Sequence, residues 1–474
     1  MKTMKKIFFF LMAISVVFSC SKDDDPVNPN VPVTPTKPDS LKLLGYSYEV
    51  GNKITNSEGS ITVRFNHPVS CNSVNTDAKE ATWKTANGDS ALVISSPIEF
   101  NSEYNIELNM TDKTTPGRTW SFNLTAKTYN GRYKYEGIVQ SVIYDYDRER
   151  IWMATILPNR LYSISMADPT KEVHKDFELC PKVLALNPYN DKLYVGFNIQ
   201  YYGEAKLYDR KVHVLDPQTL KEESAFVVSL DGNEGVDDDG EKFMLPDATP
   251  RSMAFTNDGF GVIIRGHYEG SASELCYVDS KNGNKVTYDN ENWDDYTGVV
   301  ANYDQKSVNI YMADFDGPDF YTVSRSNPTP KYHVIKVPGG TVDYRHFHRS
   351  KPIYLVQRLG ELCMMNYETN TYSPILADYA HNDFGDFDYN KENCVVKATI
   401  TYYQNGYEGY AYFIKYLDAS KAEIKYAGKI NPNGGRVQSI FMHPSRDLLA
   451  IFYVDEYDEN ATTITTIDMK PIRH

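Results

Sequence analysis

The sequence predicts an all-β protein in which a small N-terminal β-sandwich precedes a seven-bladed β-propeller. Three observations predict this fold class. A strand, turn and strand pattern recurs seven times in the chain after residue 130. The spacing of the copies brackets the period of a four-stranded propeller blade. The segment before them holds short runs in which apolar and polar residues alternate, as in half-buried strands.

The clearest copy of the repeat is KVLALNPYNDKLYVGF at residues 182–197. Its apolar runs 183–186 and 193–197 flank a cluster of turn-forming residues, which predicts a β-hairpin. Aligned on Leu193, the other copies have their first apolar residue after the turn at Ile151, Val262, Val308, Ile353, Cys394 and Leu448. Successive anchors are about 42, 69, 46, 45, 41 and 54 residues apart, so the second interval should hold an insertion.

Residues 130–474 are therefore expected to form the propeller, with about 49 residues for each blade. A circular array leaves only short, protected sheet edges, which suits so long an all-β segment. Closing the ring requires strands from both ends in one blade, and we expect residues 462–469 to pair with residues 132–136. An open solenoid fits less well, because the copies are too long and irregular for a coil of short strands.

The first 40 residues have the composition of a targeting segment and a linker. Lys2, Lys5 and Lys6 precede an apolar run at 7–18, so residues 1–19 are predicted to be a signal peptide. No later stretch is apolar enough to span a membrane. Five prolines, spaced every third residue from Pro26 to Pro38, favour an extended polyproline-II linker within residues 20–40.

Cys20 follows Ser19 directly, with Val17 at an aliphatic position, and this resembles a lipoprotein processing site. Phe18 is bulkier than that family pattern prefers. The acidic run at 21–25, SKDDD, is similar to the export signal of Bacteroidetes lipoproteins. The resemblance implies that Cys20 carries a lipid, and that the protein is anchored in the outer membrane and faces the cell exterior.

Residues 41–129 contain three runs with alternating apolar residues, at 61–70, 104–108 and 120–124. Short strands of this kind predict an all-β sandwich. The order ITVRFNHPVS, EYNIELNMTD, TWSFNLTA resembles bacterial immunoglobulin-like domains over roughly ninety residues. The resemblance implies that this module serves as a spacer.

Composition excludes some partners. The formal net charge is -14, which disfavours nucleic acid and anionic membrane surfaces as binding partners. Besides Cys20 the chain has five cysteines, an odd number, and most of them lie in separate repeats. No disulfide framework is expected, and Cys276, Cys363 and Cys394 are interpreted as buried free thiols.

We expect a ligand site on one face of the propeller. The innermost strand of each blade starts on this face, and the loop between the second and third strands opens on it. Four of the seven predicted starts carry a cation. A positive funnel with aromatic walls suits a compact anionic or aromatic ligand, because Arg both pairs and stacks. Some of these cations are alternatively expected to pair with neighbouring acids. The candidate ligand-binding residues are Lys182, Arg251, Arg265, Arg345, Arg358, Arg436, Tyr201, Tyr202, His267, Tyr268, Tyr402 and Tyr403.

No cofactor, metal site or catalytic residue is predicted. The acidic loop at 231–242 has Val236 where a calcium loop needs glycine and Lys242 where it needs glutamate. His346 and His348 share one strand face, but no Glu or Cys at ligand spacing completes a metal set. The sequence also lacks a nucleophile elbow and a phosphate loop. A catalytic pair of carboxylates has no sequence signature, so the absence of these motifs does not exclude a hydrolase.

The whole plan of lipidated cysteine, acidic export signal, linker, sandwich and propeller resembles nutrient-capture lipoproteins that partner TonB-dependent outer-membrane transporters. Their ligands include xenosiderophores, cobalamin and glycans. A ferric catecholate siderophore, which is trianionic and aromatic, matches a cationic, tyrosine-lined mouth best. Two alternatives stay open: a surface glycan-binding protein of a polysaccharide-utilisation system that stacks sugars on Tyr402 and Tyr403, and a propeller lyase or glycosidase.

Overall fold

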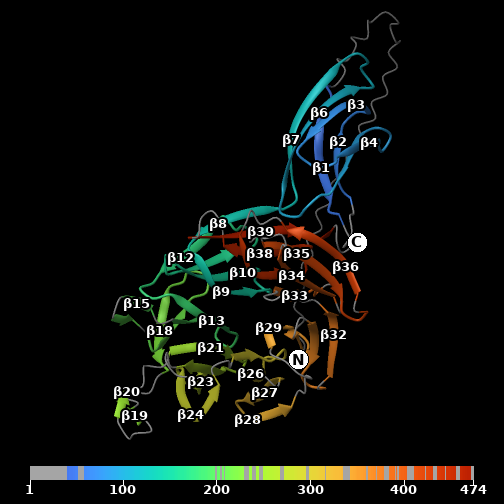
Figure 1. Ribbon diagram of the computed structural model, residues 1–474. Helices are drawn as coiled ribbons and strands as arrows, with labels where there is room; N and C mark the ends of the chain where they lie inside the picture. Colours follow the sequence, from blue (N-terminus) through green and yellow to red (C-terminus); the bar gives the residue numbers. More distant parts are fainter. Residues whose placement is uncertain are drawn as a thin grey trace, which may run out of the picture. The chain divides into compact units, whose positions relative to one another are not determined.

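The computed structural model describes residues 40–51 and 58–470, apart from short internal segments such as 335–341, 378–383 and 403–409. The chain divides into two compact units, residues 1–40 and 41–474. Cys20, the predicted signal peptide and almost all of the predicted linker lie outside the described residues. Every described element of four or more residues is a strand (Figure 1), and a 3-10 helix covers Ser280–Asn282. Within the described part, no helix has the length and apolarity needed to cross a membrane.

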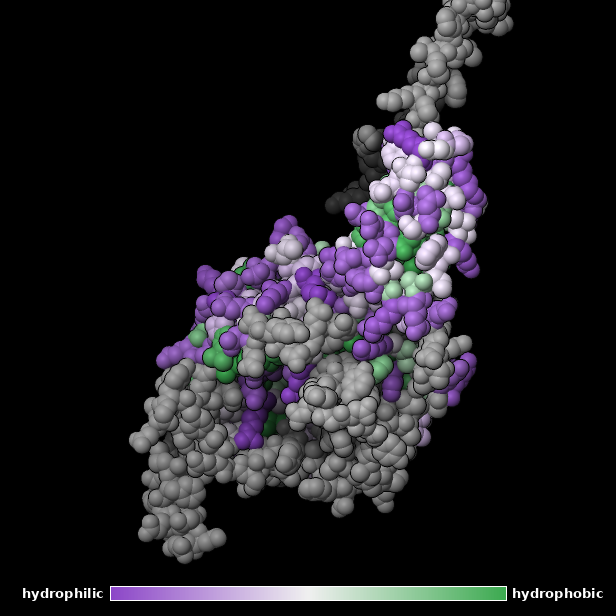
Figure 2. All heavy atoms as spheres, turned by 45° about the horizontal axis from the view of Figure 1, so that its top comes forward, coloured by the Kyte–Doolittle hydropathy of each residue, from purple (hydrophilic) through white to green (hydrophobic). Residues whose placement is uncertain are grey.

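Two sheets form the N-terminal sandwich. One has the order β1-β2-β5-β4 and the other the order β3-β6-β7, which is the strand order of constant-type immunoglobulin sandwiches. Alternate residues of β2 and β6 point into one apolar core that includes Ile61, Val63 and Leu108. Figure 2 shows mainly hydrophilic side chains on the visible side of this sandwich. Its strands are β1 (Leu43–Glu49), β2 (Gly59–Phe65), β3 (Val69–Thr76), β4 (Thr82–Ala86), β5 (Ala91–Ser96), β6 (Glu103–Asp112) and β7 (Thr119–Lys127).

Seven four-stranded antiparallel sheets follow, and each is one blade. Blades one to three comprise β9 (Ile138–Asp145), β10 (Arg150–Ile156), β11 (Arg160–Ser165) and β12 (Glu172–Asp176); β13 (Pro181–Asn187), β14 (Lys192–Phe197), β17 (Lys211–Leu215) and β18 (Glu222–Val227); and β21 (Thr249–Phe255), β22 (Phe260–Gly266), β23 (Ala272–Asp279) and β24 (Lys285–Asp294).

Blades four to seven have the same plan (Figure 1). They comprise β25 (Gly298–Ala301), β26 (Val308–Asp314), β27 (Gly317–Ser324) and β28 (Asn327–Val334); β29 (Val342–Phe347), β30 (Ile353–Arg358), β31 (Glu361–Asn366) and β32 (Thr371–Ala377); β33 (Phe384–Phe387), β34 (Cys394–Tyr402), β35 (Tyr410–Asp418) and β36 (Glu423–Ile430); and β37 (Arg436–Met442), β38 (Leu448–Val454), β39 (Ala461–Asp468) and β8 (Gly131–Glu136).

This confirms the seven-bladed propeller. Each of the seven sequence anchors lies within the second strand of a blade. The long interval contains two extra hairpins, one of β15 (Gln200–Tyr202) with β16 (Ala205–Leu207) and one of β19 (Glu234–Val236) with β20 (Lys242–Met244). The predicted closure is also present, because β39 pairs antiparallel with β8 from Ala461↔Glu136 to Thr466↔Gly131.

In blades one, two and seven, a side chain at the end of the first strand shapes the turn that follows. Asn187 Oδ1 accepts from the backbone amide of Tyr189 at 3.0 Å, and His443 Nδ1 accepts from that of Ser445 at 3.1 Å. Asp145 makes the same kind of bond to the amide of Asp147 at 2.9 Å. Such local bonds replace the strand ladder and favour a turn. The turn cluster seen in the repeat is therefore a set of side-chain caps.

The apolar core of the propeller lies between blades. Seven buried clusters each join one pair of neighbouring blades. In one of them Tyr194 from blade two packs on Phe255 from blade three, with ring centroids 4.4 Å apart. Cys276, Cys363 and Cys394 are buried, and within the described part of the chain none of them belongs to a disulfide, as predicted. Burial raises the pKa of Cys276 to about 12.

The sandwich and the propeller are joined by more than the chain. Phe100 donates its backbone amide to Lys429 O at 3.2 Å, and its ring belongs to the core cluster of blades six and seven. Arg132 Nη2 donates to Asn101 Oδ1 at 2.7 Å. The guanidinium of Arg132 also lies 4.5 Å from the ring centroid of Tyr129. These contacts tie the sandwich to the last two blades.

Candidate functional site

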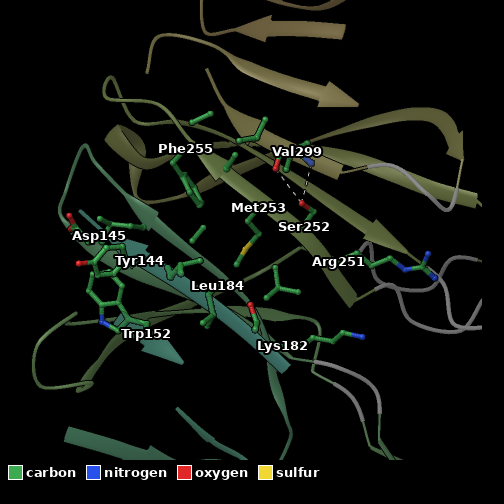
Figure 3. Close-up of a pocket in the computed structure, with 18 residues that line it drawn as sticks. Tyr144, Asp145, Trp152, Lys182, Leu184, Arg251, Ser252, Met253, Phe255 and Val299 are labelled. Atoms are coloured by element: carbon green, nitrogen blue, oxygen red, sulfur yellow. Dashed lines mark hydrogen bonds between the residues drawn. The ribbon is translucent and has the colours of Figure 1, made fainter. Parts of the chain in front are cut away.

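A cavity of about 440 Å³ lies along the first strands of blades one to four. These first strands are the innermost ones, because they contact one another from blade to blade and β37 contacts β9. The volume falls within the range of roughly 300–1,000 Å³ that small-molecule pockets have. Figure 3 shows the cavity extending along the strands, with Lys182 and Arg251 toward one end and Asp145 and Phe255 toward the other.

A β-bulge recurs near the start of the innermost strands. On β13, Pro181 pairs with Phe197 and Val183 with Gly196, which leaves Lys182 as the extra residue. On β21, Pro250 pairs with Arg265 and Ser252 with Ile264, which leaves Arg251 extra. The same register shift occurs in blades one, five and seven, where the extra residues are Gln140, Asp343 and Gln438. All five bulged residues are polar.

The bulges explain why two predicted residues come together. A bulge breaks the inward and outward alternation of a strand and redirects one side chain. In adjacent blades it directs Lys182 and Arg251 to the same end of the cavity (Figure 3). Lys182 is exposed and Arg251 half-buried. Burial raises the pKa of Cys180 to about 11, while the positive charge of nearby Lys182 acts in the opposite direction.

Neighbouring residues hold Arg251 in place. The next residue, Ser252, accepts a hydrogen bond at its Oγ from the amide of Val299 in blade four, at 3.1 Å, and this bond is drawn in Figure 3. On the paired strand, Gly266 leaves room for the arginine, because a Cβ there would lie 1.8 Å from Arg251 Nε. Three features thus position Arg251: the β-bulge, the hydrogen bond between Ser252 and Val299, and the space that Gly266 leaves.

The register changes the expected charge of the mouth. The bulged position of blade five is Asp343, and Arg345 lies two residues further along β29. In blade seven the position is Gln438, and Arg436 is an exposed residue at the first position of β37. The five equivalent positions therefore hold two cations, one acid and two amides. Among these five positions, the cations are those of blades two and three.

Arg265 is buried inside blade three and does not line the cavity. Its side chain is 1% exposed and forms an ion pair with Glu274, its cross-strand partner on β23. The guanidinium also lies 4.7 Å from the ring centroid of Tyr288, and Nη1 donates to Val228 O at 3.4 Å. These contacts engage Arg265 inside the blade, so we leave it out of the proposed site.

The remaining predicted residues are located only in part. Arg345, Arg358, Tyr201, Tyr202 and Tyr402 lie on strands, and the structure describes only their backbones: Arg345 pairs with Val356, Arg358 with Val342, Tyr201 with Lys206, Tyr202 with Ala205, and Tyr402 with Tyr410. His267, Tyr268 and Tyr403 lie outside the described residues.

Several cavity residues were missed by the sequence reasoning. The walls include Trp152 and Tyr144 of blade one and Met253 of blade three. Trp152 Nε1 donates to Pro217 O at 2.7 Å, so its polar atom is satisfied away from the cavity. Burial raises the pKa of Tyr144 above its ordinary value. An apolar residue of a blade core and one of a cavity wall look alike in sequence.

Comparison with known proteins identifies no family: no family model matches the chain, and no curated protein matches it. Among solved structures, the chain is similar to the β-propeller domain of Cps50 (Swd1) from Myceliophteria thermophila. The identity is 10%, the TM-score is 0.46, and the match covers 70% of this chain and 97% of that one. The strand order described above is the basis of the fold assignment, and this match adds nothing on function.

Proposed function

We propose that this chain is a surface lipoprotein that captures a compact anionic nutrient at the mouth of its propeller and passes it to a TonB-dependent outer-membrane transporter. The leading ligand is a ferric catecholate siderophore. One observation supports the anionic ligand above all others: adjacent bulges direct Lys182 and Arg251 to one end of a cavity of small-molecule size. The lipid anchor and the transporter rest on the sequence resemblance at Cys20 and residues 21–25.

The charge distribution supports binding of an anion. The chain is acidic overall, with a formal net charge of -14, so a pair of cations at a cavity mouth stands out from its surroundings. A concave site with low-dielectric walls focuses the field of such a pair on a ligand that enters. Arginine and lysine also have different uses: the guanidinium pairs with two oxygens at once, and the ammonium acts as a point charge.

The test uses the chain from residue 21 onward without its lipid, with quenching of protein fluorescence by a ferric tris-catecholate as the readout. Lys182→Ala and Arg251→Ala should each weaken binding about tenfold or more, because a hydrogen bond to a charged group contributes about 1.5 kcal/mol or more. Binding should weaken further as salt screens the charges. Lys221→Ala is the matched control, since Lys221 is exposed in the turn between β17 and β18 of the same blade.

Unchanged affinity in both variants would remove the anionic-ligand proposal. Affinity gels that contain neutral and charged glycans test the glycan alternative, which predicts retardation that survives both substitutions. A panel of glycosidase and lyase substrates tests the enzyme alternative. For the transporter partner, co-purification from outer membranes with the lipidated chain is the direct measurement, and a Cys20→Ser chain that stays soluble in the periplasm serves as its control.

A further inference from the structure

The segment between β5 and β6 contributes side chains to two cores. Ile98 is buried in the core of the sandwich. Phe100, two residues later, is fully buried in the core between blades six and seven. Val50, which follows β1, belongs to the same propeller core. Two sandwich side chains therefore fill space inside the propeller.

The same segment also extends the sheet of blade six. Phe100 forms a parallel β-bridge with Ile430, the last residue of the outermost strand β36, and its amide donates to Lys429 O at 3.2 Å. Glu99 lies 3.5 Å from the ammonium of Lys429, but an ion pair this exposed contributes little to stability. The buried ring and the backbone bond of Phe100 are therefore the main contacts with blade six.

The connection from the sandwich to the closing strand is bonded at both ends. Only residues 128–130 separate β7 from β8 (Figure 1). The hydroxyl of Thr128, which is buried, accepts from the amide of Ser102 at 2.9 Å and donates to Glu99 O at 2.7 Å. The amide of Asn130 donates to Thr466 O in blade seven at 2.7 Å. This connection is thus bonded to the sandwich at its start and to the propeller at its end.

The closing strand β8 is itself held by the sandwich. Arg132, the second residue of β8, donates from Nη2 to Asn101 Oδ1 at 2.7 Å and to Asn101 O at 3.0 Å. Asn101 is buried, and hydrogen bonds from a charged donor are stronger than those between neutral groups. The ring is closed by the pairing of β8 with β39, so Arg132 adds a second attachment to the strand that closes it.

From these contacts we infer that the sandwich clamps the ring closure of the propeller, and that the two parts unfold as one cooperative unit. The inference gives the sandwich a role beyond that of the spacer which its immunoglobulin-like sequence implies, and it does not depend on the proposed ligand. Residues 41–474 form one compact unit. Domains joined only by a linker move and unfold independently, whereas the core between blades six and seven is incomplete without Val50 and Phe100.

Hydrogen exchange measured by mass spectrometry tests the coupling in the chain from residue 21 onward without its lipid. Ile451→Ala places a cavity in the core of blades six and seven, and Leu108→Ala places one in the sandwich core. Each variant should speed the exchange of the slowest amides in both β6 and β38 by the same factor, about thirtyfold or more, because these amides exchange through one shared unfolding event. Exchange in β6 that Ile451→Ala leaves unchanged would overturn the inference.

Phe100→Ala tests which contact carries the coupling. Ile451→Ala added to Phe100→Ala should still speed exchange in β38 but should leave β6 within twofold. Phe452→Ala is the matched control, because Phe452 is equally buried but lies in the core between blades seven and one; in that background the coupling should persist. Coupling that survives Phe100→Ala would contradict the proposed clamp. Circular dichroism checks folding, and if Phe100→Ala does not fold, the comparison of Ile451→Ala with Leu108→Ala decides alone.

Discussion

The hydroxyl of Tyr146 donates a hydrogen bond to Asp386 Oδ2 at 2.7 Å and so links the turn after β9 in blade one to the innermost strand of blade six. The amide of Met442 in blade seven donates to the same oxygen at 2.6 Å. Oδ1 accepts from the amide of Phe387 at 2.7 Å and the hydroxyl of Tyr389 at 3.3 Å. Asp386 is fully buried, and four donors from three blades satisfy its carboxylate.

Asp386→Asn should destabilise the propeller although it preserves the side-chain shape. An amide offers one acceptor oxygen and two donor hydrogens, so one pair of donors would face another donor. A buried donor without an acceptor costs about 1–3 kcal/mol, and we expect a loss of about 2 kcal/mol or more in the free energy of unfolding. Urea unfolding followed by tryptophan fluorescence measures it.

The control for Asp386→Asn is Tyr146→Phe, which removes one of the four donors and leaves the carboxylate otherwise satisfied. Its expected cost is about 1 kcal/mol, the usual net value of one hydrogen bond. An Asp386→Asn variant as stable as the wild type would show that the carboxylate does not hold the three blades together.

Gly266→Ala should weaken anion binding at the mouth of the cavity without removing a charge. The added Cβ would lie 1.8 Å from Arg251 Nε and 2.2 Å from its Cζ. These atoms belong to the end of a flexible side chain, so the arginine is expected to move while the backbone stays. Anion affinity should then fall to about the level of Arg251→Gln, with an unchanged unfolding midpoint. In the Arg251→Gln background the same glycine substitution should add nothing, as a double-mutant cycle requires of one shared effect.

Much of the fold was predictable because turn-forming residues separate the strands in each copy of the repeat. Polar caps such as Asn187 and His443 end the first strand of a blade by bonding to the next backbone amides, and these residue types are visible in sequence. Blade closure was predictable for a similar reason, since residues 132–136 and 462–469 were the unpaired strands left at the two ends.

The site was harder to predict because it depends on register. A bulge is a property of two paired strands, so nothing in residues 343–345 alone says that Asp343 occupies the position equivalent to Lys182. Arg265 has the same difficulty: its partner Glu274 becomes adjacent only when β22 and β23 pair. The sequence therefore predicts Lys182 and Arg251, which line one cavity, and it also predicts Arg265, whose side chain is buried inside a blade.

The buried thiols make a prediction about reactivity. Cys180, Cys276, Cys363 and Cys394 are buried, whereas Cys71 is half-buried. Burial raises the pKa of Cys71, Cys180, Cys276 and Cys394, and the thiolate is the reactive form. With the chain from residue 21, dithionitrobenzoate should label Cys71 slowly and the four others only after denaturation. Cys71→Ser should abolish labelling of the native protein; rapid modification of several thiols would contradict the buried assignment.

His213 should make stability depend on pH near neutrality. Its Nε2 lies 2.9 Å from Asp209 Oδ2 and its Nδ1 lies 3.1 Å from Glu222 Oε1. Burial alone would lower the pKa of His213, but the hydrogen bond to Asp209 and the nearby carboxylate of Glu222 outweigh it, and the net pKa is raised. Lys175, 3.5 Å from Glu222, is the nearby cation that opposes the protonated ring.

The raised pKa of His213 determines how the stability of the fold changes with pH. A raised pKa in the folded state means that the protonated histidine stabilises the fold below its unfolded pKa of about 6.5, and that this contribution is lost as pH rises through the folded pKa. The wild type should therefore exceed His213→Gln in unfolding midpoint most at pH 5–6, with the difference shrinking above neutrality. Thermal unfolding of both chains across pH 5–9 measures it. A constant difference would assign His213 a packing role against Phe197, whose ring centroid lies 5.0 Å away, and not an ionic one.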